Sequence, residues 1–223
     1  MQAVNNTVLE DFEGWTLRVR HPAQTPARLM LMLHGWTGDE NSMWVFVRNF
    51  PEEYLLIAPR GPHPAPQAGF SWRPPRADSF GRPSLEDFRV SAGALVQLVD
   101  AYAARHQVDA SQFDVIGFSQ GAALSNVLAC LYPERIRRAG ILAGFMPSGM
   151  DEIILQKPLN GKQVFVSHGT QDNMVPIDRA LASMSLLEQA GAHITYCEAE
   201  VGHRVSSSCV RGLEAFFQPK GNG

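Results

Sequence analysis

The sequence predicts an α/β fold, namely a doubly wound, mostly parallel sheet with helices on both faces. Along most of the chain, short and continuously apolar runs alternate with longer segments in which apolar residues recur at helical spacing. The apolar runs lack the polar alternation of a strand with one exposed face, which is typical of parallel strands covered on both sides. No internal repeat or low-complexity tract interrupts this order.

Size and composition are those of an ordinary globular protein. The 223 residues suffice for one substantial core, so we expect a single domain over residues 1–223. The formal net charge of −3 is too small and too evenly spread to favour nucleic acid or an anionic membrane surface as a partner. We expect a monomer or homodimer that acts on a small molecule.

The remaining compositional signals concern location, redox state and cofactors. The first residues contain no basic segment followed by an apolar run, and no window reaches the apolar length of a membrane span, so we expect a cytoplasmic protein. Cys130, Cys197 and Cys209 are an odd number of cysteines at wide spacing, which favours buried reduced thiols. No cluster has the spacing of metal ligands or of a phosphate-binding loop, so we expect no cofactor.

Residues 1–27 are expected to form a β-hairpin and a loop at the edge of the sheet. The alternating runs 8–12 and 15–19 flank Glu13 and Gly14, as in a hairpin with one buried face.

The first parallel strands are expected at residues 29–33 and 54–58, which are continuously apolar. Between them, Asn41 or Ser42 is expected to cap a helix that reaches Phe50. The expected order is therefore strand, helix, strand.

Residues 59–83 are rich in proline, glycine and arginine without periodicity, which predicts a long ordered loop over the edge of the sheet where the strands end. Ser84, with Asp87 three residues later, then indicates the start of a helix. The apolar face of this helix is formed by Leu85, Phe88, Ala92, Leu95, Val96, Val99, Tyr102 and Ala103.

Two further strands are expected at residues 139–144 and 164–166, and the segment 146–162 between them is too short for an inserted cap domain. A helix should begin at Pro176 and end at Gly191. Its expected buried stripe is Ile177, Leu181, Met184 and Leu187.

The last predicted strand covers residues 193–197. It is followed by a closing helix that buries Leu213, Phe216 and Phe217.

The strongest functional signal is Gly-x-Ser-x-Gly at residues 117–121, between an apolar strand and a helical pattern. In this context the motif predicts a nucleophile elbow, a sharp turn on which the hydroxyl of Ser119 stands clear of the backbone. Gly117 and Gly121 occupy the two positions where a side chain would collide across the turn.

Two other polar residues follow predicted strands, at the edge of a parallel sheet where ligands bind. Asp172 and His203 come after Ser119 in the order nucleophile, acid, base. His193 also follows Asp172, but it lies at the entry of its strand, at the opposite edge. The sequence therefore predicts a catalytic triad in which His203 takes the proton of Ser119 and Asp172 holds the imidazole.

An oxyanion formed at such a site requires backbone donors. The candidates are the amides of Gln120, next to the nucleophile, and of Trp36, just after a strand end. We expect the side chains of Gln120 and His34 to support the surrounding loops. The candidates for lining an acyl pocket are Trp36, Phe70, Trp72, Phe118, Phe145, Met146, Met174 and Val175.

Five motifs in order, at residues 33–35, 117–121, 143–147, 168–172 and 202–203, resemble the phospholipase/carboxylesterase family of α/β-hydrolases, which includes acyl-protein thioesterases. The resemblance implies an α/β-hydrolase fold without a cap domain. It also implies a serine esterase that acts on small to medium acyl esters without a cofactor.

Two other functions remain open at this point. An acyl-protein thioesterase or a lysophospholipase would use the same residues on long acyl chains. A hydrolase-like binding module would keep the fold and use the crevice only to hold a ligand, although such a module has no need for a serine, a histidine and an aspartate together.

Overall fold

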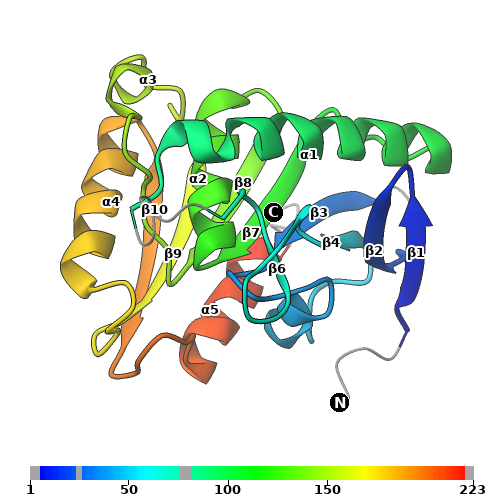
Figure 1. Cartoon of the computed structure of the whole chain (residues 1–223). Helices are drawn as coiled ribbons and strands as arrows, with labels where there is room; N and C mark the ends of the chain where they lie inside the picture. Colours follow the sequence, from blue (N-terminus) through cyan, green and yellow to red (C-terminus); the bar gives the residue numbers. More distant parts are fainter. Residues whose placement is uncertain (1–5, 24–26, 76–81, 219–223) are drawn as a thin grey trace.

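The computed structural model describes residues 6–23, 27–75 and 82–218, and within them a central sheet is flanked by helices (Figure 1). The strands of this sheet are β1 (Val8–Phe12), β2 (Trp15–Arg20), β3 (Arg28–Leu33), β4 (Tyr54–Pro59), β7 (Phe113–Phe118), β8 (Ile136–Leu142), β9 (Gln163–Gly169) and β10 (His193–Ala199). Their order across the sheet is β1-β2-β4-β3-β7-β8-β9-β10. The hairpin β1–β2 is antiparallel and the strands from β4 to β10 are mutually parallel, as predicted.

The helices cover both faces of the sheet. They are the 3₁₀ helix η2 (Ser42–Phe46) and the α-helices α1 (Leu85–His106), α2 (Gln120–Leu131), α3 (Asp151–Leu155), α4 (Ile177–Gln189) and α5 (Ser207–Phe217). Side chains of α1, α2 and α4 share one hydrophobic core, while η2 and α5 contribute to a second core on the opposite face. In Figure 1, α1 runs along the top of the sheet and α5 lies below it.

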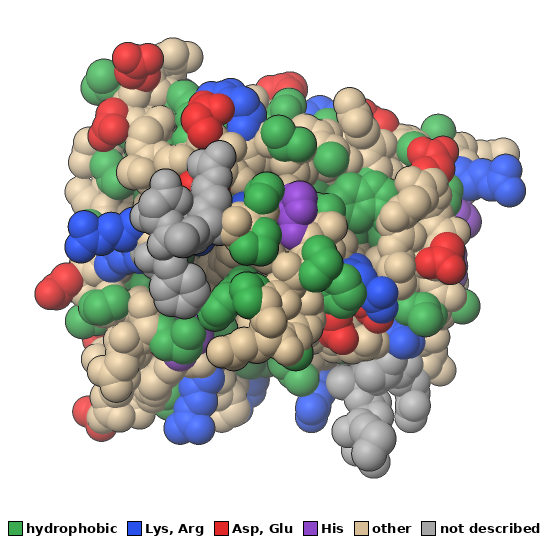
Figure 2. Space-filling model, in the orientation of Figure 1, with side chains coloured by type: hydrophobic (Ala, Val, Ile, Leu, Met, Phe, Trp, Pro, Cys, Tyr) green, Lys and Arg blue, Asp and Glu red, His purple; other side chains and the backbone are tan. Residues whose placement is uncertain are grey.

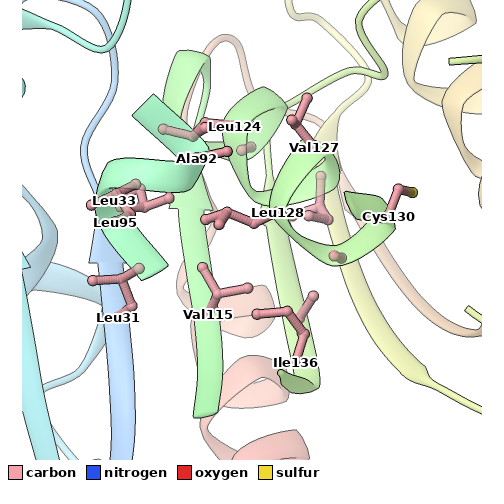
Figure 3. Close-up of a cluster of buried hydrophobic side chains, with 14 of the residues drawn as sticks. Leu31, Leu33, Ala92, Leu95, Val115, Leu124, Val127, Leu128, Cys130 and Ile136 are labelled. Atoms are coloured by element: carbon pink, nitrogen blue, oxygen red, sulfur yellow. The ribbon is translucent and has the colours of Figure 1, made fainter. Parts of the chain in front are cut away.

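The strand β3 explains why the buried runs are continuously apolar. Leu31 and Leu33 pack into the core beneath α1 and α2, and Figure 3 shows them beside Val115 of β7. Met30 and Met32 point the other way, into the core beneath α5. Because successive side chains of a strand alternate between faces and both faces are covered, every position has to be apolar.

The helix α1 begins as its sequence predicts. The Ser84 backbone N–H donates to Asp87 at 2.8 Å, and the two residues form a capping box. All eight residues of the predicted apolar face are buried.

The segment after β3 differs from the prediction. The expected helix to Phe50 is the short 3₁₀ helix η2, although Phe50 itself is buried. Asp39 accepts hydrogen bonds from the Asn41 backbone N–H at 2.9 Å and from the Ser42 hydroxyl at 3.1 Å. Such local side-chain bonds offer the backbone an alternative to an α-helix. Asn41 occupies the N-cap position of η2, as one of the two expected caps, but its side chain makes no capping hydrogen bond.

Where the structure describes it, the ordered loop predicted at 59–83 has more secondary structure than expected. It contains the short strands β5 (His63–Pro64) and β6 (Phe70–Ser71), which pair antiparallel, whereas residues 76–81 lie outside the described residues. Between β8 and β9 the described chain contains the five-residue helix α3, consistent with the absence of a cap domain. Among the described residues, no helix has the length and apolarity needed to cross a membrane.

Of the four residues in the predicted buried stripe of α4, only Leu187 is buried, and two others are half-buried. Leu181 is 44% exposed, and the residues that face the core are Ala180, Ser183 and Leu187. Ser183 is accommodated there because its hydroxyl oxygen accepts the Met146 backbone N–H at 2.7 Å. A buried serine with such a partner cannot be told from a surface serine by periodicity alone.

The expectation of three reduced cysteines was wrong for two of them. Cys197 in β10 and Cys209 in α5 form a disulfide, with Cα atoms 5.6 Å apart. Their spacing in the sequence carries no signal, because the fold brings the end of β10 beside the first turn of α5. Cys130 is a buried free thiol as predicted, and burial raises its pKa to about 12.

Candidate active site

Ser119 lies on the sharp turn between β7 and α2. Its backbone has φ 53° and ψ −112°, a conformation that is rare for a residue with a side chain. A Cβ at Gly117 would lie 2.2 Å from the Gly121 carbonyl oxygen, and a Cβ at Gly121 would lie 2.1 Å from that of Leu33. Both glycines are therefore required by the close approach of the backbone, as predicted from the motif.

The three predicted catalytic side chains come together at the carboxyl ends of the strands. His203 Nε2 lies 2.9 Å from Ser119 Oγ, and His203 Nδ1 lies 2.7 Å from Asp172 Oδ2. Asp172 follows β9, and His203 lies on the loop between β10 and α5. Residues that are remote in the sequence thus form one continuous chain of hydrogen-bonding groups.

The carboxylate of Asp172 is buried and held from two sides. Its Oδ1 accepts the backbone N–H groups of Met174 and Val175, each at 2.9 Å. His168 Nε2 lies 3.5 Å from Oδ2 and 2.7 Å from the Val175 carbonyl oxygen. These contacts fix the orientation of the carboxyl group and direct Oδ2 toward His203.

The two segments proposed to supply oxyanion donors lie beside the elbow. A Cβ at Gly35 would be 3.0 Å from the Phe118 ring and 3.4 Å from Ser119 Cβ, so the backbone that leads to Trp36 is adjacent to the nucleophile. Gln120 is the first residue of α2, and the first amides of an α-helix have no acceptor within the helix. Trp36 and Gln120 line the same cavity as Ser119.

A cavity of about 720 Å³ opens beside Ser119. Much of its wall is apolar and includes Pro66, Pro74, Pro75, Phe145 and Val175, so prolines of the proline-rich loop lie beside Ser119. Figure 2 shows hydrophobic side chains gathered around the middle of the face that carries β6.

Among the residues expected to contact a substrate, Trp36, Phe145, Met174 and Val175 line this cavity. Met174 is 66% exposed and forms part of the rim. The cavity also receives Arg73 of the proline-rich loop and Arg179 of α4, of which sequence reasoning did not single out Arg179. The Arg179 guanidinium lies 3.6 Å from the centre of the Phe145 ring. Only the fold brings α4 against the loop after β8, so no local pattern predicts this contact.

Trp72 does not line the cavity, because its side chain is fully buried. Its indole Nε1–H donates to the His34 carbonyl oxygen at 2.8 Å, and its backbone N–H donates to Gln120 Oε1 at 2.9 Å. The hydroxyl of Ser91 in α1 donates to the Trp72 carbonyl oxygen. Trp72 therefore joins the proline-rich loop to the elbow and to α1.

Three other candidates have different neighbours. Phe70 packs against the Arg60 guanidinium, 4.6 Å from its ring centre, and its backbone pairs with the loop at Gly38. The Phe118 ring lies 5.1 Å from the ring of His203, centre to centre. Met146 lines a second cavity, of about 770 Å³.

The expected supporting roles of Gln120 and His34 have counterparts in the structure. Gln120 Nε2 donates to Ser71 Oγ at 3.1 Å, in addition to the bond from Trp72. His34 is buried, and its Nε2 accepts the Gly61 backbone N–H at 2.9 Å. Burial lowers the pKa of His34, so its ring is held in the neutral form that this acceptor role requires.

No group of three or more histidine, cysteine, aspartate or glutamate side chains in the described part of the chain is arranged to hold a metal ion.

A serine on a strand-to-helix elbow, with an acid and a histidine at the ends of later strands of a mostly parallel sheet, defines the α/β-hydrolase class. Within that class, the chain belongs to the phospholipase/carboxylesterase family, whose model matches residues 16–219.

Two proteins of similar sequence are named as a carboxylesterase and an acyl-protein thioesterase, in agreement with this family membership. The chain is 30% identical to carboxylesterase SOBER1 of Arabidopsis thaliana over 115 residues, 49% of each protein, so the match spans about half the length of that relative. It is 25% identical to acyl-protein thioesterase 1 of Debaryomyces hansenii over 197 residues, 78% of this chain and 82% of that protein.

Solved structures show the same fold. A carboxylesterase from Mesorhizobium loti aligns with a TM-score of 0.79 and 22% identity over 95% of this chain and 98% of its own. The Bacillus cereus carboxylesterase aligns with a TM-score of 0.77 and 21% identity over 92% of this chain and 94% of its own.

Proposed function

We propose that this protein is a serine carboxylesterase that hydrolyses small to medium acyl esters through an acyl-enzyme intermediate. The observation that carries the proposal is the contact of His203 with both Ser119 and Asp172, at 2.9 and 2.7 Å. These distances lie within the range needed for proton transfer between a nucleophile, its base and an orienting carboxylate. Family membership supports the same reaction class.

In the proposed reaction, His203 Nε2 accepts the proton of Ser119 Oγ as this oxygen attacks the ester carbonyl. Asp172 accepts a hydrogen bond from Nδ1–H, which selects the required tautomer and stabilises the imidazolium. The imidazolium then gives its proton to the departing alcohol. In the second half-reaction, His203 takes a proton from water as the water oxygen attacks the acyl group on Ser119. The imidazolium then returns this proton to Ser119 Oγ as the bond to the acyl carbon breaks and the acid departs.

The oxyanion of each tetrahedral intermediate is proposed to bind the backbone amides of Trp36 and Gln120. Both residues line the cavity beside Ser119, and Gln120 begins α2, whose N-terminal dipole end favours negative charge. One such donor lowers the barrier by about 3 kcal/mol. The strained turn at Ser119 keeps its oxygen in place relative to these amides.

The proposed substrate size follows from the cavity beside Ser119. Its volume of about 720 Å³ lies in the range that encloses small organic ligands. The apolar wall formed by the prolines, Phe145 and Val175 suits an acyl chain or an apolar alcohol.

Ser119→Ala tests the proposal directly. Turnover of p-nitrophenyl acetate should fall by a factor of about 10⁴ or more, because the nucleophile and its base act as a unit. An unchanged circular dichroism spectrum would show that the fold is kept, and a fluorophosphonate probe should label wild-type protein at Ser119. Retained turnover in the variant would refute the proposal, and absence of labelling in folded wild type would favour the binding-module alternative.

The second candidate is a thioesterase or lysophospholipase that acts on long acyl chains. Two observations favour it: the similarity to an acyl-protein thioesterase, and a second cavity of about 770 Å³ that shares Pro83 and Arg179 with the first. Matched esters and thioesters from two to sixteen carbons would separate the candidates. A kcat/KM that peaks at short chains supports the carboxylesterase, whereas a peak at long-chain thioesters supports the alternative.

A cytoplasmic location, a single domain and a monomeric or dimeric state stay predictions. The Cys197–Cys209 disulfide argues against the cytoplasmic location, because disulfides are rare in the reducing cytosol.

A further inference from the structure

The loop that carries His203 is closed by the disulfide. Cys197 and Cys209 are 12 residues apart, and His203 lies midway between them. In Figure 1 the loop runs from the end of β10 to the start of α5. The crosslink therefore joins the two elements on which the position of His203 depends.

The first half of this loop has other attachments to the fold. The Thr170 backbone N–H donates to the Ala199 carbonyl oxygen at 2.9 Å, and the Gln171 backbone N–H donates to the Val201 carbonyl oxygen at 3.1 Å. A Cβ at Gly169 would lie 2.2 Å from the Val201 carbonyl oxygen, so this part of the loop packs directly on the turn after β9. The chain before His203 is thus fixed independently of the disulfide.

The second half is attached to the first turn of α5. Ser206 Oγ accepts the Cys209 backbone N–H at 3.2 Å and begins the helix. Ser207 and Ser208 are exposed, and Cys209 is the buried residue of this turn, 1% exposed. The far end of α5 is fixed separately by the buried side chains of Leu213 and Phe217.

We propose that Cys197 and Cys209 are positioning residues for His203, and that reduction of their disulfide by a dithiol lowers the rate of ester hydrolysis. This inference rests on the proposed function. The bond holds the first turn of α5, and hence the chain after His203, against β10. Without it this attachment loosens, and a displacement of about 1 Å between reacting groups costs on the order of 100-fold in rate.

The redox step is an ordinary thiol–disulfide exchange. A thiolate of the dithiol attacks one sulfur of the disulfide, and the second thiol of the reductant then resolves the mixed disulfide. The S–S bond breaks, Cys197 and Cys209 each become a thiol, and the dithiol closes to its own disulfide, so two electrons and two protons are transferred. Cys197 is partly exposed and offers the route of attack, whereas Cys209 is buried.

The test compares oxidised and reduced wild-type protein. Treatment with dithiothreitol, followed by anaerobic desalting, should raise the number of thiols titrated in denaturant from one to three, because Cys130 is already free. With p-nitrophenyl acetate we expect kcat to fall about tenfold, KM to stay within twofold, and both to recover on reoxidation. A purely structural crosslink would leave kcat of the folded protein unchanged.

Two variants complete the test. Cys197→Ala/Cys209→Ala should have the low kcat of the reduced enzyme and should not respond to dithiothreitol. Cys130→Ala, which removes the thiol that takes no part in the disulfide, should behave as wild type.

Equal kcat in reduced and oxidised protein, with hydrolysis still abolished by Ser119→Ala, would overturn the inference and leave the proposed function intact. Loss of circular dichroism in both the reduced protein and the double variant would also overturn it, because the disulfide would then hold the fold and not the base. Full turnover in Ser119→Ala would refute the proposed function itself.

Discussion

The glycines that flank Ser119 let three segments of backbone approach one another. A methyl group at position 117 would lie 2.2 Å from the carbonyl oxygen of Gly121, a contact that no side-chain movement can relieve. We therefore expect Gly117→Ala to lower the free energy of unfolding by about 3 kcal/mol or more.

Gly93 offers a matched control for this substitution. It lies within α1, where an added Cβ would come no closer than 3.4 Å to the Tyr132 hydroxyl. Gly93→Ala should raise the free energy of unfolding by about 0.5 to 1 kcal/mol, because alanine is the better helix former. Urea titrations of both variants measure the difference, and equal effects would contradict the role given to Gly117.

Burial of His34 predicts a pH dependence of stability. Burial lowers the pKa of His34 below its ordinary value, against smaller opposing effects of the Gly35 carbonyl, Asp39 and Glu40. As the pH falls through about 6.5, the unfolded chain takes up a proton at this residue before the folded chain does. Stability contributed by neutral His34 is therefore present above this pH and lost below it.

The variant His34→Gln tests this linkage, because glutamine keeps an acceptor for the Gly61 N–H but does not titrate. The melting temperature of wild type should fall between pH 7 and pH 5, and the fall should be smaller in the variant. An identical pH dependence in both proteins would show that His34 does not contribute.

At the scale of elements, the capping box at the start of α1 ties the proline-rich loop to the longest helix described. Ser84→Ala removes the hydroxyl that belongs to this box and should lower the free energy of unfolding by about 1 kcal/mol. Ser185→Ala, at an exposed helical position, should change it by less than about 0.5 kcal/mol. If chemical denaturation gave both variants the same stability, the capping box would have no net effect.

Most elements follow from local patterns, and the errors have identifiable causes. The buried face of α1 was predicted from periodicity because tertiary packing and sequence spacing agree there. The structure of the segment after β3 was not predicted, because hydrogen bonds that the Asp39 carboxylate accepts from Asn41 and Ser42 compete with an α-helix. In α4, the small residues Ala180 and Ser183 face the core, and the larger Leu181 does not.

At the scale of the whole molecule, the disulfide closes a loop between the last strand and the last helix. In the chain-entropy model, a crosslink over a loop of about this length stabilises the native state by about 3 kcal/mol. Cys197→Ala/Cys209→Ala should lower the free energy of unfolding by about this amount in urea titrations. The control Cys130→Ala leaves the disulfide intact and should keep its contribution to the free energy of unfolding. A double variant as stable as oxidised wild type would contradict the expectation.

Some residues of the candidate site were predicted from the sequence, and the position of others depends on tertiary contacts. Ser119, Asp172 and His203 were predicted because each follows a strand, and parallel strands bring their carboxyl ends to one edge. Trp72 was assigned to the substrate pocket because it lies in a loop at that edge, yet its hydrogen bonds with His34 and Gln120 hold it in the interior. Whether a loop side chain faces a cavity or the core depends on partners that are distant in the sequence.

By itself, the sequence determined the alternation of strands and helices, the elbow around Ser119 and the edge at which Asp172 and His203 lie. These features follow from hydrophobic periodicity and from steric limits within a few residues, so they can be read locally. Only the tertiary structure decided that Cys197 pairs with Cys209, that Arg179 packs on Phe145, and that Trp72 is buried. Each of these depends on the distance between elements that are separate in the chain, and no local pattern specifies that distance.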